Sequence, residues 1–244
     1  MSGNQPQGNP SARRSVRSFV LRKGRLTPAQ KQALDRLWPR YGIDSSSTLL
    51  DLEAVFGCIA PLTVEIGFGN GDALAELAHL TPQEHFIGIE VHPPGIGHLL
   101  RLLESRQLEN VRVASGDAVG FIEERLADAA VAGFRVWFPD PWPKKRHHKR
   151  RLIQPGFVQL LVKKLQPGGV IHLATDWAPY AEHMLEVLSA ESGLRNLSGS
   201  DDFCERPDWR PLTRFECRGE RLGHETRDLL FEKREEFHPD SRQT

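Results

Sequence analysis

The sequence predicts an α/β fold in which helices cover both faces of a mostly parallel β-sheet. Short apolar runs of the length of a buried strand recur from Leu62 onward, and segments of helical length and periodicity separate them. Strands that alternate with helices form right-handed βαβ units, which place their strands parallel in one sheet. The chain has 244 residues, of which 39% are hydrophobic and 26% charged, and this composition suits one such domain.

The apolar runs and the periodic segments define the expected elements. Strands are expected at 62–66, 86–90, 111–114, 134–138 and 170–175. Helices are expected at 72–79, 96–107, 121–130, 156–165 and 178–188. Two further short strands are expected near 214–217 and 228–233. Since neither an internal repeat nor a second linker is evident, we expect one domain over residues 62–234.

The charges are balanced overall but unevenly distributed. The chain has 32 basic and 32 acidic residues, so its net charge does not point to a nucleic-acid partner. No acidic residue precedes Asp35, however, and the same stretch holds these cations: Arg13, Arg14, Arg17, Arg22, Lys23, Arg25 and Lys31. Residues 1–16 are rich in Gly, Pro, Asn and Ser and predict a disordered tail, 17–61 predict a basic arm with a helical segment, and 235–244 predict a C-terminal tail.

Cysteine spacing and hydropathy exclude several classes of protein. Cys58, Cys204 and Cys217 lie far apart without a CxxC pair, so we expect neither a metal site nor a disulfide framework. No apolar run approaches the roughly 18 residues of a membrane helix, and the N-terminus has no apolar segment typical of a secretion signal. We therefore expect a cytoplasmic protein. An Arg- and Ser-rich start is also typical of an organellar transit peptide, but a basic arm is the preferred interpretation.

Three acidic residues mark the ends of successive predicted strands, where open parallel sheets bind ligands. Glu65 precedes a turn in which Gly67 and Gly69 permit close approach of a ligand to the backbone. Glu90 follows about 20 residues later, the spacing at which an acid accepts hydrogen bonds from ribose hydroxyls. Asp117 can accept from an adenine amino group. Each acid alone is equally compatible with a helix cap or a solvated surface, but together they favour a nucleoside site.

The chemistry of the glycine turn selects among nucleoside cofactors. A dinucleotide fingerprint requires GxGxxG, whereas this turn reads GxGxG with Asp72 in the third place, and Glu65 would repel a pyrophosphate. A carboxylate matches a cofactor with an ammonium and a sulfonium group. We therefore expect S-adenosylmethionine, with a nicotinamide-dependent dehydrogenase as the weaker alternative. The layout resembles the Rossmann-like class I methyltransferase fold.

A proline-rich turn with a basic run follows the fourth predicted strand. Pro139 and Pro141 stiffen a turn that holds Asp140 and Trp142, an acid and a ring suited to a base edge and a base face. The run of cations at 144–151 is suited to phosphate contacts that position a nucleic acid, although an isolated run is often a solvated face or a targeting patch. Histidines amid so many cations are poor metal ligands, so we expect no metal.

These motifs resemble the bacterial tRNA (guanine-N7)-methyltransferases, which modify the guanine at position 46 in the variable loop. The resemblance covers about residues 17–233. The stretches that carry it are RSFVLRKGRLT, VEIGFGNGD, FIGIEVHPPGIG, FPDPWPKKRHHKRR, LATDWAPYAEHMLEV and TRFECRGERLGHETRDLLFE. The glycine turn is common to many methyltransferases, whereas the PDPW turn with its basic run and the TDW and TRFE segments are specific.

The resemblance implies roles for individual residues. It implies that Glu65, Glu90, Asp117 and Asp140 bind S-adenosylmethionine and that Asp140 is catalytic. Contacts to the tRNA are implied for two groups of residues. The first group is Lys144, Asp176, Thr213, Arg214, Phe215 and Glu216 at the guanine, and the second is Arg146, His147, His148, Lys149, Arg150 and Arg151 on the RNA.

Other interpretations of the same residues remain open. Asp176 is also compatible with a helix cap, and Thr213 and Glu216 with ordinary strand residues. Alternatives for the whole chain are a methyltransferase for another RNA, a protein or a small molecule, and a noncatalytic RNA-binding module. Either a monomer or a homodimer is compatible with the sequence.

Overall fold

The structure is a computed structural model that describes residues 25–45, 48–200, 202–220 and 222–235. The tail expected at 1–16 lies outside these ranges, as does the tail expected at 235–244 apart from Glu235. Most of the basic stretch before Asp35 also lies outside the described residues.

One eight-stranded sheet organises the described chain, with the strand order β1-β4-β3-β2-β5-β6-β8-β7. The strands are β1 (Gly42–Ile43), β2 (Leu62–Ile66), β3 (His85–Glu90), β4 (Val111–Ser115), β5 (Val131–Trp137), β6 (Leu165–Thr175), β7 (Leu194–Asn196) and β8 (Arg227–Lys233). The first six strands run parallel, and β8 pairs antiparallel with both β6 and β7. This mostly parallel sheet confirms the predicted fold class.

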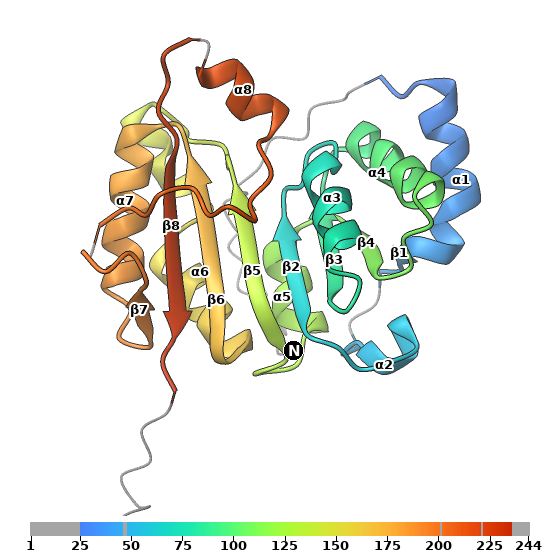
Figure 1. Cartoon of the computed structure of the whole chain (residues 1–244), viewed down its shortest axis with the longest axis horizontal. Coiled ribbons are helices and arrows are strands. Elements are labelled where there is room, and N and C mark those ends of the chain that lie inside the picture. Colours follow the sequence, from blue (N-terminus) through green and yellow to red (C-terminus); the bar gives the residue numbers. More distant parts are fainter. Residues whose placement is uncertain (1–24, 46–47, 201, 221, 236–244) are drawn as a thin grey trace, which may run out of the picture.

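Helices cover both faces of the sheet (Figure 1). On one face lie α1 (Pro28–Tyr41), α3 (Asp72–Leu80) and α4 (Pro93–Ser105), and on the other lie α5 (Ala118–Arg125), α6 (Pro155–Lys164) and α7 (Ala178–Ser189). Two short helices, α2 (Leu52–Phe56) and α8 (Arg214–Glu220), lie outside these layers. Within the described ranges, no helix is both long and apolar enough to cross a membrane.

The described residues before Leu62 contact the sheet domain through a helix and a short strand. Helix α1 packs on α4, and β1 pairs with β4 at the edge of the sheet. Thr27 begins α1 with a capping box: its side chain accepts from the Gln30 amide, and the Gln30 side chain accepts from the Thr27 amide. The helical segment expected in 17–61 is thus an integral part of the fold.

Most predicted elements are present, with shifted ends. The predicted helix at 121–130 begins earlier and ends at Arg125, because the chain must turn before β5 begins at Val131. The predicted strand at 170–175 begins at Leu165.

The strand expected at 214–217 is wrong, since these residues lie in helix α8. The Thr213 side chain accepts a hydrogen bond from the Glu216 amide at 3.1 Å, and the Glu216 carboxylate lies 3.4 Å from the Thr213 amide. These contacts form the reciprocal capping box of a helix N-terminus. The sequence contains the Thr-x-x-Glu pattern of such a box at residues 213–216.

The order of the strands determines where a ligand can bind. Strands β3 and β4 follow β2 along the chain and extend the sheet in one direction, and β5 then pairs with the other side of β2. The loops after β2 and β5 therefore leave the sheet toward opposite faces, which opens a crevice at the strand ends.

A glycine contact brings α4 against the turn that follows β2. A Cβ placed on Gly95 would lie 2.0 Å from the carbonyl oxygen of Gly69. That distance is far below van der Waals contact, so the first turn of α4 reaches this position only because residue 95 lacks a side chain.

Gly95→Ala is therefore expected to destabilise the protein by about 1–3 kcal/mol, the range for overpacking a tight contact. Gly156→Ala is the matched control, because Gly156 also lies in a helix but has open space where its Cβ would be. This control should be neutral or stabilise by up to about 1 kcal/mol. Urea unfolding measures both variants, and equal effects would contradict the role of the close contact.

Candidate functional site

A cavity of about 350 Å³ opens at the ends of four neighbouring parallel strands. Its lining includes Gly67 after β2, Glu90 at the end of β3, Asp117 after β4 and Asp140 after β5. The structure thus brings together four residues that the sequence placed at consecutive strand ends.

Glu90 holds the glycine turn in place. One carboxylate oxygen, Oε2, accepts from the Gly69 amide at 2.9 Å, and Oε1 accepts from the amides of Val91 at 2.7 Å and His92 at 3.0 Å. The side chain is 9% exposed and lines the cavity. Because each carboxylate oxygen has two lone pairs, Glu90 retains acceptor capacity for a hydroxyl group in the cavity.

Asp117 combines the two roles that the sequence left open. Its Oδ1 accepts from the Val119 amide at 3.3 Å and so caps α5. The same carboxyl group lines the cavity. An ionised carboxylate has about four acceptor positions, so the cap leaves capacity for a donor such as an exocyclic amino group.

Glu65 lies in a second cavity of about 480 Å³ that adjoins the first. The two cavities share the residues Gly67, Trp137 and Phe138, and the second also borders the rest of the glycine turn and α8. Glu65 is 3% exposed, and its Oε2 has no hydrogen-bond partner among the residues that the structure describes.

The burial of Glu65 raises its pKa to about 7, an effect that Arg135 partly offsets and Glu90 reinforces. A buried carboxyl group with an unused acceptor oxygen matches a cationic donor such as an ammonium group.

Strained aromatic residues flank the turn that contains Asp140. Phe138 has φ +53° and Trp142 has φ +46°, values that side-chain-bearing residues rarely adopt. The Phe138 amide donates to the Ala174 carbonyl at 2.8 Å, which ties the start of the turn to the end of β6. Asp140 is exposed at the rim of the first cavity. Backbone strain of this kind persists where the surrounding structure fixes it, often at functional sites.

Arg151 differs from the other cations of the basic run because it is buried, with 4% exposure. Its guanidinium donates to the carbonyls of Pro141 at 3.0 Å and Pro179 at 3.3 Å and packs over the Tyr180 ring. These contacts fasten the Asp140 turn to the start of α7. The geometry gives Arg151 a structural role in the turn rather than a free surface for RNA.

The remaining basic residues form an exposed turn. Lys144 is followed by a 3₁₀ helix at Lys145–Arg150, and Lys144, Arg146, Lys149 and Arg150 are exposed. Arg150 lies over the Trp142 ring at 5.1 Å, so this ring organises the basic turn.

Two half-buried histidines belong to the same turn. The His147 ring meets the edge of Trp142 at 5.8 Å, and burial together with the neighbouring cations lowers the pKa of His147. His148 contacts Arg151 at 3.2 Å. Among the described residues, no group of three or more His, Cys, Asp or Glu side chains is placed to hold a metal ion.

The segment at 213–216 supplies one wall of the second cavity. Thr213 and Phe215 line it, and Phe215 is 52% exposed and packs on Phe138 at 5.1 Å between ring centroids. In this segment Glu216 is buried and paired with Arg210, so its carboxylate does not face the cavity in this structure. Of Arg214, only its place in α8 is described.

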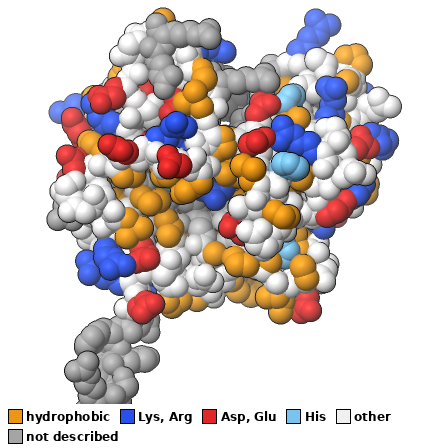
Figure 2. Space-filling model, in the orientation of Figure 1, with side chains coloured by type: hydrophobic (Ala, Val, Ile, Leu, Met, Phe, Trp, Pro, Cys, Tyr) orange, Lys and Arg blue, Asp and Glu red, His pale blue; other side chains and the backbone are white. Residues whose placement is uncertain are grey.

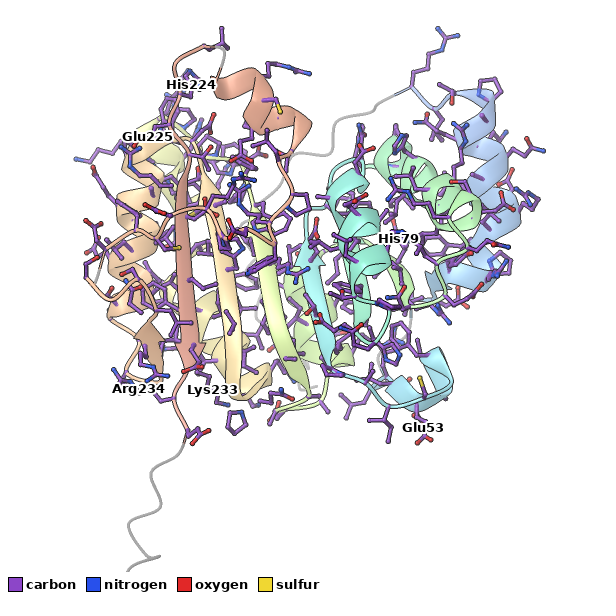
Figure 3. All side chains as sticks on the ribbon, in the orientation of Figure 1. Glu53, His79, His224, Glu225, Lys233 and Arg234 are labelled. Carbon is purple, nitrogen blue, oxygen red and sulfur yellow. The ribbon has the colours of Figure 1, made fainter. Side chains whose placement is uncertain are left out.

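Asp176 lies at the same edge of the sheet as α8. Its Oδ2 is 3.1 Å from Nδ1 of His224, which precedes β8. Figure 3 labels His224 and Glu225 just before the start of β8, on the side of α8, and Lys233 at the last residue of that strand. The contact connects the end of β6 to the loop after α8.

Sequence reasoning missed a buried polar cluster beneath α8 that contains His172, Arg210 and Asp228. No sequence signal marks these residues, because Arg210 lies in an irregular polar segment and His172 and Asp228 are single polar residues within strands. Their burial depends on how the segment after β7 crosses the sheet.

The mostly parallel sheet with helices on both faces is the Rossmann-like fold of the class I methyltransferases. Among solved structures, the chain is similar to the 16S rRNA methyltransferase KamB, with a TM-score of 0.56, 15% sequence identity, and coverage of 80% of this chain and 99% of that one. An rRNA methylase from Streptococcus thermophilus matches with a TM-score of 0.50 and 12% identity over 72% of this chain and 88% of that one. At these identities the similarity concerns the fold.

Sequence comparison identifies the family more narrowly. Residues 59–229 match a family model described as "Putative methyltransferase". The chain is 54% identical to the tRNA (guanine-N(7)-)-methyltransferase of Alcanivorax borkumensis over 91% of this chain and 92% of that one. It is 52% identical to the enzyme of the same name from Neisseria meningitidis over 94% and 97% of the two chains. The chain belongs to the tRNA (guanine-N(7)-)-methyltransferase family.

The buried Glu65 carboxyl group makes the stability of the free protein depend on pH. Its pKa is higher in the folded than in the unfolded chain, so the ionised form destabilises the fold above pH 7, and this effect disappears as the pH falls toward 4.5. Glu65→Gln should raise the free energy of unfolding at pH 8 by on the order of 3 kcal/mol. The gain should shrink toward pH 5.

Glu90→Gln is the matched control in thermal or urea unfolding at both pH values. It should destabilise the protein, because it directs an amide group at backbone N–H donors that a carboxylate satisfies. A Glu65→Gln variant that is less stable than the parent at pH 8 would contradict the assigned environment.

Proposed function

We propose that this protein transfers a methyl group from S-adenosylmethionine to N7 of the guanine at position 46 in the variable loop of tRNA, and that it acts in the cytoplasm. The observation that supports this most directly is the pair of adjoining cavities that meet at Gly67, Trp137 and Phe138. One cavity has the acids suited to an adenosine group, and the other is bordered by rings suited to a base. The names of the relatives supply the substrate.

The residues fit the proposed cofactor, which supplies an electrophilic methyl group on a sulfonium. Glu90 retains acceptor capacity for the ribose, and Asp117 for the adenine amino group. The unpartnered Oε2 of Glu65 suits the ammonium group of the methionine part. Gly67 and Gly69 have positive φ and leave the space above the turn free of side chains.

The target atom needs no general base, because guanine N7 has an in-plane lone pair and no proton. The protein's task is to hold N7 in line with the methyl group, an orientation effect worth up to about 7–11 kcal/mol in favourable systems. Phe138 and Phe215 provide ring faces and edges beside the second cavity. Asp140, at the rim of the first, is the proposed catalytic residue. Its carboxylate either stabilises the cationic guanine or accepts hydrogen bonds from the base edge.

The exposed basic turn is the proposed phosphate-binding surface. Its cations follow the Asp140 turn directly, and Arg150 packs over Trp142 of that turn. Phosphate contacts position a nucleic acid and supply much of its affinity. The proposed surface comprises Lys144, Arg146, His147, His148, Lys149 and Arg150. Asp176 and Thr213, at the same edge of the sheet, are proposed to contact the guanine.

The function is tested by incubating the protein with labelled S-adenosylmethionine and tRNA and identifying the labelled nucleoside. We expect 7-methylguanosine at position 46. In single-turnover reactions with saturating cofactor and tRNA, Asp140→Ala should lose at least about a hundredfold in rate. Asp140→Asn should lose as much if charge dominates, and less if acceptance from the base edge dominates.

A rate of Asp140→Ala within a few-fold of the parent would remove Asp140 from the reaction. Label in another nucleoside, or in none, would overturn the proposed substrate.

The phosphate-binding role is tested by neutralising two exposed cations. Arg146→Gln with Lys149→Gln should weaken tRNA binding and reduce its salt dependence by about 0.7–0.9 per lost contact, without altering cofactor affinity. Lys163→Gln with Arg195→Gln is the matched control, because both side chains are exposed cations away from the cavities. An identical salt dependence in both double variants would show that the basic turn does not bind phosphates.

A further inference from the structure

We infer that a buried charge network centred on Arg210 positions helix α8 and thereby sets the width of the second cavity. The network consists of Arg210, Glu216, Asp228 and His172, and Trp137 lies at its inner end. This inference rests on the proposed function, because it assigns these four residues a positioning role in the binding of the target base.

Arg210 is the centre of the network, and its side chain is fully buried. The Nη1 atom donates to Glu216 Oε2 at 2.7 Å, and Nη2 donates to Oε1 at 2.5 Å. The other side of the guanidinium faces Asp228: Nη2 donates to Oδ2 at 3.1 Å, and Nε lies 2.8 Å from Oδ1 without hydrogen-bond geometry. Two carboxylates thus share one planar cation, which fixes the direction of each.

The network continues into the sheet and reaches the wall common to both cavities. Asp228 Oδ1 lies 2.8 Å from Nε2 of His172, and the Trp137 indole donates to Nδ1 of His172 at 3.0 Å. Since Nδ1 accepts, Nε2 carries the proton and donates to Asp228, which is the neutral form of the ring. Trp137 itself lines both cavities. The strands β5, β6 and β8 are therefore connected to α8 through side chains.

Helix α8 depends on this network for its position. A helix of seven residues is not stable by itself, so its position comes from tertiary contacts. Glu216 is 3% exposed, whereas the neighbouring Phe215 is 52% exposed. Figure 2 shows hydrophobic side chains at several places on the surface. Trp209, Leu212 and Phe215 are half-exposed. Glu216 is thus the most deeply buried side chain described in α8, and its only ion-pair partner among the described residues is Arg210.

The same turn of helix places the groups that border the cavity. Thr213 caps α8 through the Glu216 amide, and Phe215 precedes Glu216 directly. A displacement of Glu216 therefore moves the Thr213 hydroxyl and the Phe215 ring together. A bidentate pair restrains rotation as well as distance, which an apolar contact does less strictly.

The variants below separate a role of the network in positioning α8 from a role in the stability of the protein alone. The test uses the full chain with Arg210→Lys, which keeps the charge but loses the planar fork, and Glu216→Gln, which keeps the shape but loses the charge. The control is Lys164→Met. Lys164 is equally buried and donates to the Leu126 carbonyl at 2.6 Å and to Asp128 at 2.9 Å, next to the start of β6. It contacts neither cavity.

All rates are measured well below the melting temperature of each variant. Arg210→Lys and Glu216→Gln should lower the single-turnover methylation rate at saturating tRNA by at least tenfold, with cofactor affinity by calorimetry within about twofold of the parent. Hydrogen exchange should become faster at the Glu216 and Cys217 amides, which donate to Thr213. Lys164→Met should lower the melting temperature without changing the rate or this exchange.

The inference is overturned if the two network variants methylate at the parental rate, or if they lose rate while the exchange of α8 stays parental. A parent protein that does not methylate tRNA would instead contradict the proposed function. In that case the exchange measurement still decides whether Arg210 positions α8.

Discussion

Three backbone amides that converge on the Glu90 carboxylate are the contact on which the site depends. The amides of Val91 and His92 orient the carboxylate, and the Gly69 amide joins it to the glycine turn after β2, at the place where the order of the strands reverses. Gly95 then allows α4 to pack against the same turn. With the turn held from both sides, the acids at the neighbouring strand ends face a common cavity.

The fold was largely predictable because its signals are local. Buried parallel strands read as apolar runs, and the glycines and acids that follow them are adjacent to those runs in the chain. The grouping of Glu90, Asp117 and Asp140 around one cavity follows from parallel strand direction alone. The ends of the elements were less predictable. The helix after Asp117 ends at Arg125, whose buried side chain donates to the carbonyls of Asp44 and Thr48, residues distant in the sequence.

The C-terminal part was predicted less well, for two different reasons. The Thr-x-x-Glu pattern of a capping box is present at Thr213 and indicates a helix N-terminus, whereas the short apolar pattern around Phe215 favours a strand. The burial of Arg210 was not readable, since it arises from partners on β8 and α8 that only the fold brings together. Arg151 shows the same limit: in the sequence it continues a basic run, but in the structure it is fastened inside the turn. A run of charged residues predicts an exposed segment, but it does not show which side chain of the run is buried.

The unpartnered oxygen of Glu65 has a consequence for how such a protein evolves and turns over. A buried acid with one unpaired oxygen, whose charge Arg135 offsets only in part, should make the protein less stable near pH 8 than the same fold with a neutral residue there. Selection for thermal robustness alone would remove it, and only selection for ligand binding retains it. In a cell, the fraction of molecules open to proteolysis then rises when the ligand is scarce. Abundance of the protein would thus follow the supply of its ligand without any dedicated regulator.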